Sequence, residues 1–260
     1  MTPPKFSAEQ RARLRADLLE YAARDRRISG AAITGSAAAG AEDEWSDIDL
    51  ALGVADSARL PDVLSDWTEH MYGQRFALHH VDVAFGAWIY RVFLLPGALQ
   101  VDLAFAPAAE FRALAPSFRL MFGEASEPRH LQPPQPATLI GLAWLHALHA
   151  RSSIARGHFW QAEYMISGVR DHALALACLR HGLPAAHARG FDQLPAGLTR
   201  QFEASLVRHL DLTELSRAFR VALQGLLIEV RNMDENLAGR LEATLTNLSQ
   251  VSPSYPSPLQ

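Results

Sequence analysis

A short proline-rich segment, residues 126–136, divides this 260-residue chain into two parts with different hydrophobic patterns. Four of its residues are prolines, which excludes a regular helix or a central strand there. Before it, short apolar runs alternate with turns, as in a sheet with flanking helices. After it, apolar residues recur at helical spacing over residues 137–250. The sequence therefore predicts an α+β first domain over residues 1–125, a linker, an all-helical second domain, and a disordered tail over residues 251–260.

The first domain combines helix signals with several strand patterns. Ser7 and Gln10 fit a capping box in front of the first helix, and Pro61 and Gly73 mark the start and end of a second one. The Pro-Gly-Ala segment at residues 96–98 predicts a hairpin connection between two strands. The expected strands cover residues 28–36, 46–54, 76–86, 89–96 and 98–107.

The composition excludes several classes of protein. The chain is 49% hydrophobic and 20% charged with a formal net charge of −4, whereas nucleic-acid-binding proteins usually show a basic excess. The single cysteine, Cys178, leaves no partner for an internal disulfide. No apolar run approaches the roughly 18 residues of a membrane span, and the N-terminus lacks the apolar core of a signal peptide. We therefore expect a cytoplasmic protein with no membrane partner.

Two aspartates interrupt an apolar strand pattern in SDIDLALGV, residues 46–54. Residues i and i+2 of a strand face the same side, so Asp47 and Asp49 are expected to project together, with Ile48 and Leu50 packed on the other face. Two neighbouring carboxylates in a partly apolar site repel each other and resist ionisation. A divalent cation removes this penalty, and hard oxygen ligands suit Mg²⁺. We therefore predict that Asp47 and Asp49 bind a metal ion.

The segment LQVDLAF, residues 99–105, supplies a third candidate carboxylate. Its apolar residues occupy alternate positions, which leaves Asp102 on the opposite face. Three strand-borne carboxylates could hold two ions about 3.5–4 Å apart, the arrangement that serves in-line phosphoryl or nucleotidyl displacement. Asp82 in HHVDVAF is the alternative third carboxylate, because it also interrupts an apolar strand. The alternative for the pair itself is two solvent-exposed strand aspartates.

Small residues precede the aspartate pair. Gly35 and Ser36 end the strand before it, and small residues continue to Gly40. Such a turn exposes backbone N–H groups and one hydroxyl to a phosphate, which bulky side chains would keep away. Ten residues separate Ser36 from Asp47, which is enough for the chain to enter the neighbouring strand. A triphosphate held on the turn could then meet metal ions held on the strand.

Gly-Ser, about ten residues, and then Asp-Ile-Asp within SDIDL, with a later Asp on a strand, resembles the nucleotidyltransferase superfamily related to DNA polymerase beta. The resemblance implies that Gly35 and Ser36 bind the phosphates and that Asp47, Asp49 and Asp102 are the catalytic metal ligands. A catalytic half followed by a helical half is similar to the antibiotic-modifying members, which act on aminoglycosides and lincosamides.

One departure from the family pattern concerns the residue after Gly-Ser. Many relatives carry arginine there, whereas Ala37 brings no cation to the phosphates, and Arg170 of the helix FWQAEYMISGVRDHALALACL could take that role. Glu163 lies on the same helix face and could be the general base for the attacking hydroxyl. A salt bridge, within the helix or between domains, is the alternative for both residues. Trp160 and Tyr164 could line an acceptor pocket, although helical aromatic residues more commonly belong to the core.

The resemblance implies an enzyme that uses Mg²⁺, with two ions expected, to move a nucleoside monophosphate from a nucleoside triphosphate to a hydroxyl of a small antibiotic-like acceptor. The expected donor is ATP, the group moved is AMP, and pyrophosphate is released. A second hypothesis is nucleotidylation of a protein or an RNA, of which RNA is disfavoured by the weak acidity. A third is a non-catalytic nucleotide-binding module, which would need fewer carboxylates. Two copies could pair through the helical domain as a homodimer.

Overall fold

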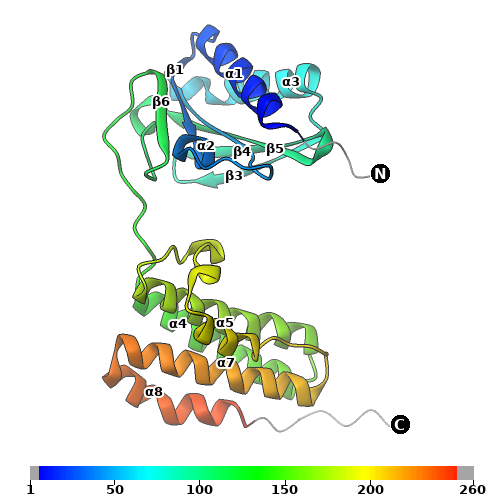
Figure 1. Ribbon diagram of the computed structural model, residues 1–260, viewed down its shortest axis with the longest axis vertical. Coiled ribbons are helices and arrows are strands. Elements are labelled where there is room, and N and C mark those ends of the chain that lie inside the picture. The colour runs from blue at the N-terminus through cyan, green and yellow to red at the C-terminus, as the bar shows by residue number, and fades with distance from the viewer. Residues whose placement is uncertain (1–5, 251–260) are drawn as a thin grey trace. The chain divides into compact units, whose positions relative to one another are not determined.

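The computed structural model describes residues 6–250, which form an α+β part followed by a helical part (Figure 1). The chain divides into two compact units, Met1–Leu131 and Gln132–Gln260. The predicted fold class, a mixed sheet with flanking helices and then an all-helical region, is confirmed. The predicted disordered tail, residues 251–260, lies outside the described residues.

The first unit is built on a six-stranded sheet with the strand order β3-β4-β5-β2-β1-β6. Neighbouring strands run antiparallel except for β2 and β5, which pair in parallel at the centre of the sheet. The mixed sheet therefore places two strands that are distant in the sequence side by side. The strands are β1 (Ile28–Thr34), β2 (Ile48–Val54), β3 (His79–Phe85), β4 (Trp88–Leu95), β5 (Leu99–Pro107) and β6 (Phe118–Gly123).

Two helices, α1 (Ala8–Arg24) and α3 (Leu60–Arg75), cover one face of this sheet (Figure 1). The strands alternate apolar side chains toward the helices with other residues toward the opposite face. Burying this apolar surface is what stabilises the unit. The core between helices and sheet includes Leu18, Ile33, Ile48, Leu50, Trp67, Met71, Val101, Leu103 and Phe105.

The opposite face of the sheet carries small residues at its centre. Ala32, Ala51 and Ala104 lie side by side on three adjacent strands and pack in a small cluster with Trp88 and Phe111. Two residues before Ala51 and Ala104, the same face carries aspartates instead of alanines. The carboxylates are therefore on the face that α1 and α3 do not cover.

The helix ends show one agreement and one difference from the sequence pattern. The capping box of α1 is confirmed: Gln10 N donates to Ser7 Oγ over 3.1 Å, and Ser7 N donates to Gln10 Oε1 over 2.8 Å. The prediction that α3 ends at Gly73 is wrong, because the helix continues to Arg75. The chain leaves it through Phe76, which has a left-handed φ of 56°, and the next residue, Ala77, donates its N–H to the carbonyl of Met71 over 3.0 Å.

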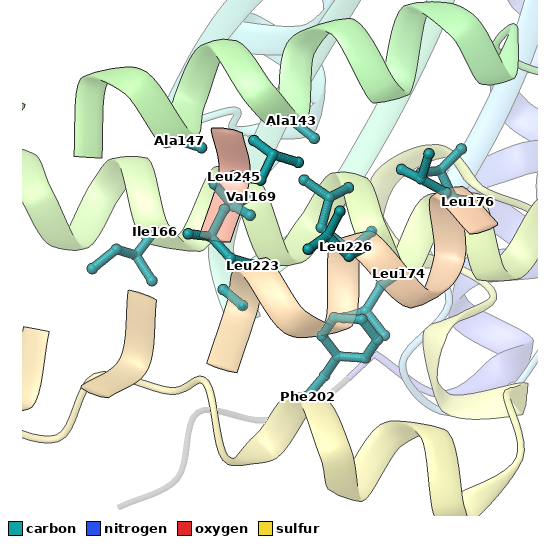
Figure 2. Close-up of a cluster of buried hydrophobic side chains, with 14 of the residues drawn as sticks. Ala143, Ala147, Ile166, Val169, Leu174, Leu176, Phe202, Leu223, Leu226 and Leu245 are labelled. Atoms are coloured by element: carbon teal, nitrogen blue, oxygen red, sulfur yellow. The ribbon is translucent and has the colours of Figure 1, made fainter. Parts of the chain in front are cut away.

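The second unit is a bundle whose core is rich in alanine and leucine (Figure 2). Alanines such as Ala143 and Ala147 on one helix let its neighbour approach closely, and a Cβ added at Gly168 would stand 2.3 Å from the His146 ring. None of the described helices combines the length and apolar character needed to cross a bilayer. The helices are α4 (Pro136–Ala155), α5 (Phe159–Arg180), α6 (Ala196–Glu203), α7 (Leu212–Met233) and α8 (Glu235–Leu248).

Candidate functional site

Asp49 and Asp102 occupy directly paired positions on the parallel strands β2 and β5. Adjacent strands lie about 4.8 Å apart, and paired residues share a face, so the two side chains start from neighbouring points on the sheet. The predicted orientation of the pair is confirmed at Asp49, since Ile48 and Leu50 are completely buried on the other face. The apolar partners of Asp102, Val101 and Leu103, are completely buried on that face too.

The alternation predicts Asp47 within the strand. In the structure it lies one residue before the start of β2. A tight turn formed by Asp43 and Ser46 ends immediately before it, with Asp43 N donating to Ser46 Oγ over 2.9 Å. Gln100 Nε2 donates to Asp47 Oδ2 over 3.3 Å. Gln100 is not among the residues predicted from the sequence, although its position two residues before Asp102 indicates that both face the same side. Gln100 therefore holds the carboxylate of Asp47 on the β5 side of the sheet.

The carboxyl of Asp102 has a perturbed pKa. Burial, and then the negative charge of Asp47, raise the pKa of Asp102 from its ordinary value of 3.8 to about 6. Burial and the charge of Asp102 also raise the pKa of Tyr90 on the adjacent strand β4. Asp102 Oδ1 is buried and has no hydrogen-bond partner among the described residues. A buried carboxylate oxygen without a partner is costly unless a cation or a donor group binds to it.

The predicted phosphate turn is the start of a short helix, α2 (Gly35–Ala39), and not an extended loop. Small side chains allow this turn to fold back directly after β1, and Gly40 ends it with a φ of 68°. Gly35 has a φ of 61°, and a Cβ added there would stand only 1.9 Å from Asp49 Oδ2. The hydroxyl of Ser36 is buried and lacks a hydrogen-bond partner within residues 6–250. The structure thus brings the backbone of the turn against the carboxylate of Asp49.

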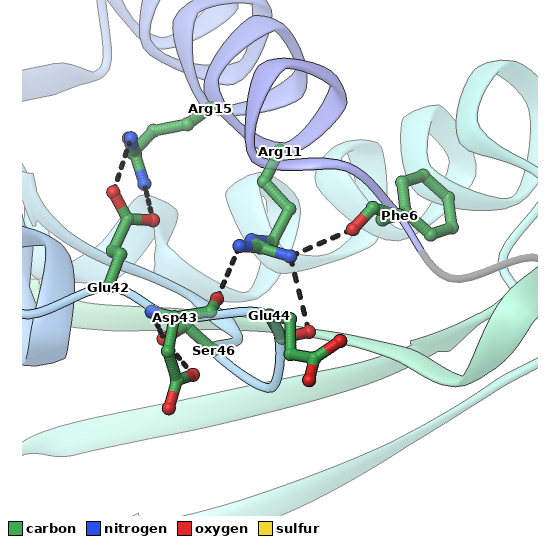
Figure 3. Close-up of polar contacts among 7 residues, drawn as sticks. All are labelled: Phe6, Arg11, Arg15, Glu42, Asp43, Glu44 and Ser46. Atoms are coloured by element: carbon green, nitrogen blue, oxygen red, sulfur yellow. Dashed lines mark hydrogen bonds and ion pairs between the residues drawn. The ribbon is translucent and has the colours of Figure 1, made fainter.

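The loop that leads from α2 to the aspartates is tied to helix α1 by two arginines (Figure 3). Arg11 is only 2% exposed and donates to the main-chain carbonyls of Phe6, Asp43 and Glu44. Its neighbour Arg15 forms a bidentate ion pair with Glu42, with distances of 2.7 and 3.1 Å. These contacts fix the entry of the chain into β2. The sequence gives no local signal for them, because the partners are about thirty residues apart.

Asp82, the alternative third carboxylate, lies elsewhere on the sheet. It is on β3, which β4 and β5 separate from β2. Its carboxylate accepts two hydrogen bonds from the guanidinium of Arg91, at 2.7 and 2.6 Å, and this pairing lowers the pKa of Asp82. The structure therefore places Asp102, and not Asp82, beside Asp49.

The predicted residues of the second unit all lie on α5. Glu163 accepts a hydrogen bond of 2.8 Å from Ser167 Oγ, one turn along the helix. Arg170 contacts its neighbour Asp171, with Nε 3.6 Å from Oδ1. Trp160 and Tyr164 are 79% and 67% exposed, so the interpretation of these two as core residues is wrong. The apolar stripe of α5 instead uses small and aliphatic residues such as Ala162 and Ile166.

The fit of a divalent cation can be judged from the donor atoms of the first unit. Three carboxylates supply the hard oxygen ligands that Mg²⁺ prefers, and the orphaned Oδ1 of Asp102 lacks the partner that such an ion provides. Within the described part of the chain, no three His, Cys, Asp or Glu side chains are already arranged so that they could hold a metal ion. The chemistry of the donors therefore fits the ion, and the three-aspartate ligand set stays a prediction.

Comparison with known proteins gives matches at the level of structure only. No family model matches the sequence, and no curated protein matches it. Among solved structures, the chain is similar to a crystal structure of an aminoglycoside 6-adenyltransferase from Bacillus subtilis. The identity is 12%, the match covers 90% of this chain and 96% of that one, and the TM-score is 0.39. A likeness of this size carries no functional argument.

Proposed function

We propose that this chain is a nucleotidyltransferase that moves a nucleoside monophosphate from a nucleoside triphosphate to a hydroxyl group of a small acceptor. The observation that carries the proposal is the contact between Gly35 and the Asp49 carboxylate, which is itself paired in register with Asp102. A turn suited to phosphate thus lies next to a pair of carboxylates, and the strands that carry these groups are neighbours in the sheet. Their placement depends on the register of the sheet, which resists displacement.

The proposed reaction is an in-line displacement at the α-phosphorus. The acceptor oxygen forms a bond to this phosphorus, the bond to the oxygen bridging the α- and β-phosphates breaks, and pyrophosphate leaves. The first N–H groups of α2 and the unpartnered hydroxyl of Ser36 are suited to bind phosphate oxygens. Mg²⁺, held by Asp47, Asp49 and Asp102, would neutralise the polyphosphate and polarise its phosphoryl oxygens.

The remaining parts of the proposal are the proton acceptor, the additional cation and the substrates. We propose that Glu163 accepts the proton of the attacking hydroxyl and that Arg170 contributes the positive charge that Ala37 does not supply. ATP is proposed as the donor, and a hydroxyl-rich, antibiotic-like molecule as the acceptor. A general base contributes about 10²–10⁴-fold to the rate of such a step, so each residue can be tested by itself.

The proposal is tested by incubating the full chain with Mg²⁺ and each α-labelled nucleoside triphosphate, alone and with a panel of hydroxyl-rich antibiotics. Pyrophosphate release together with label on a small molecule is the expected result. Label on protein or RNA identifies the second class of acceptor, and tight triphosphate binding without turnover identifies a non-catalytic module. The Asp49→Asn variant is the control, since it removes the charge and keeps the shape of the side chain. Equal turnover by this variant overturns the proposal.

A further inference from the structure

A pocket of about 410 Å³ opens beside Asp47 in the first unit. Its walls come from the tight turn before β2, from the hairpin connection between β4 and β5, and from the start of α1. Asp47 and its hydrogen-bond partner Gln100 both line it, so the pocket shares Asp47 with the candidate carboxylate site. The lining also includes Phe6, Trp45, Ala98 and Leu99.

Trp45 presents a large aromatic surface at this pocket, since its side chain is 73% exposed. The turn that carries it is rigidly held, because Trp45 N donates to Asp43 Oδ1 over 2.9 Å and Ser46 Oγ donates to the same oxygen over 3.0 Å. Arg11 donates to the carbonyls of Asp43 and Glu44 within this turn (Figure 3). The indole is therefore exposed on a backbone that is fixed, a combination typical of an aromatic platform for a ligand.

The walls of the pocket combine apolar and polar groups. Phe6, Ala98 and Leu99 contribute carbon atoms, whereas Asp47 and Gln100 contribute polar groups. The face of a nucleobase needs no hydrogen-bond partner and stacks well on an indole, while its edge carries donors and acceptors. The pocket therefore suits a flat, aromatic ring with a polar edge.

The position of the pocket relative to the phosphate turn agrees with this choice. The turn lies against Asp49, whereas the pocket lies at Asp47, two residues earlier and about 6–7 Å along an extended chain. A nucleoside triphosphate has its phosphates at one end and its base at the other, with the α-phosphate between them. Phosphates at Gly35 and a base at Trp45 thus leave the α-phosphate next to the aspartates.

We propose that this pocket binds the base of the nucleoside triphosphate, stacked on the indole of Trp45. This inference rests on the proposed function and deepens it, because it assigns a binding site for the part of the donor that the phosphate turn does not recognise. Stacking tolerates any base, so Trp45 contributes affinity for nucleotides in general and little discrimination among them.

The test compares two ligands that differ only in the nucleoside. Binding of a non-hydrolysable ATP analogue and of inorganic tripolyphosphate, each with Mg²⁺, is measured by calorimetry for the full chain and its Trp45→Ala variant. Loss of base stacking should weaken analogue binding roughly 5- to 150-fold, with tripolyphosphate affinity unchanged within about twofold. Trp45→Phe, which keeps an aromatic face, should recover most of the loss. Phe85→Ala is the matched control, since Phe85 is 49% exposed at the end of the edge strand β3, and it should leave analogue affinity unchanged.

Two results overturn the inference. One is equal affinity of the wild type and Trp45→Ala for the analogue, and the other is an equal loss for both ligands, which would reflect a damaged phosphate site. Failure of the proposed function is recognised separately. A wild-type chain that binds the analogue but releases no pyrophosphate contradicts transfer and leaves the base pocket standing, whereas a chain that binds neither ligand contradicts both proposals.

Discussion

The backbone of Gly35 lies directly against the carboxylate of Asp49, so closely that a Cβ at Gly35 would stand 1.9 Å from Asp49 Oδ2. Two independent features thus require glycine at this position, since Gly35 also has a φ of 61°. Any side chain would have to push Asp49 aside. The contact joins the proposed phosphate turn to the proposed metal ligand. A substitution at Gly35 can therefore test whether the position of Asp49 depends on the turn.

Gly35→Ala is expected to reduce nucleotidyl transfer at least about 100-fold, because a displacement near 1 Å at a reacting centre has effects of this size. Gly40→Ala is the matched control: Gly40 has a similar φ of 68°, but nothing lies within 4 Å of its added Cβ. Both variants should lose about 1–2 kcal/mol in the free energy of unfolding from the left-handed backbone alone. Urea unfolding and steady-state rates measure both. Equal activity losses in the two variants would contradict the role of the Asp49 contact.

The choice between Asp102 and Asp82 can be tested by the same substitution at each position. Asp102→Asn is expected to abolish transfer, because this carboxyl is paired in register with Asp49. Asp82→Asn removes only the ion pair with Arg91, and the Asp82 side chain is 42% exposed. This substitution should therefore lower the free energy of unfolding by less than about 1 kcal/mol and leave transfer intact. Rates and circular dichroism of the two variants decide the matter. Transfer that is lost in Asp82→Asn and kept in Asp102→Asn would reverse the assignment.

The local geometry of the site follows from strand periodicity. The burial of Ile48 and Leu50 on one face is what the alternation around Asp49 predicts, and Asp102 obeys the same rule. What the sequence cannot provide is the register that places these two aspartates opposite each other. Register depends on the pairing of β2 with β5, which is a long-range contact, and no local signal encodes it.

Other features were hidden for different physical reasons. The buried Arg11 resembles an ordinary surface arginine in a helix pattern, because its partners are main-chain carbonyls that carry no side-chain signature. The general tendency of helical aromatic residues favours a core position for Trp160 and Tyr164, but α5 packs closely on its neighbours with small residues and leaves these rings exposed. Sequence patterns reliably predict which helices and strands form. They predict less reliably which side chains the tertiary packing leaves outside the core.

The raised pKa of Asp102 predicts a pH-dependent effect on stability in the absence of metal. The folded protein holds this proton up to about pH 6 and the unfolded chain only to about 3.8, so the folded state binds more protons between these values. The contribution of Asp102 to the unfolding free energy therefore falls as the pH rises through this window. Asp102→Asn cannot ionise, and it should be more stable than the wild type at pH 7.5.

Thermal unfolding with a chelator present, measured from pH 4 to pH 7.5, checks this prediction. The advantage of Asp102→Asn should shrink below pH 6 and become small near pH 4, where the folded-state carboxyl is protonated and the unfolded-state carboxyl is close to half protonated. Added Mg²⁺ should raise the melting temperature of the wild type and not that of the variant. A stability difference that is constant with pH would show that the carboxyl of Asp102 is not perturbed.

Two substitutions distinguish the role of the Glu163 carboxylate as a base from its role as a hydrogen-bond acceptor. Glu163→Gln removes the basic oxygen and is expected to reduce kcat by about 10²–10⁴-fold, whereas Ser167→Ala removes only the 2.8 Å hydrogen bond and should have a small effect. The pH–rate profile is the second readout, because loss of a general base removes the acidic limb. Similar small effects of both substitutions would assign Glu163 a structural role.

The stability of the helical unit depends on an ion pair that sequence periodicity does not reveal. Arg180 at the end of α5 donates to both carboxylate oxygens of Glu229 on α7, at 3.1 and 3.0 Å, and Glu229 is only 2% exposed. Arg180→Met leaves this buried carboxylate without its partner, which should cost about 3 kcal/mol or more of unfolding free energy. Urea unfolding followed by circular dichroism measures the loss.

The double variant Arg180→Met with Glu229→Leu separates the value of the pair from the cost of an orphaned charge. Replacing both partners by apolar side chains of similar size removes the desolvation penalty of the carboxylate, so the double variant should be more stable than Arg180→Met alone. Because 31% of the Arg180 side chain is exposed, its own charge is already partly hydrated, and most of the cost of the single substitution should come from Glu229. If the double variant were the less stable of the two, the pair would be stabilising in its own right, and the interface between α5 and α7 would depend on it.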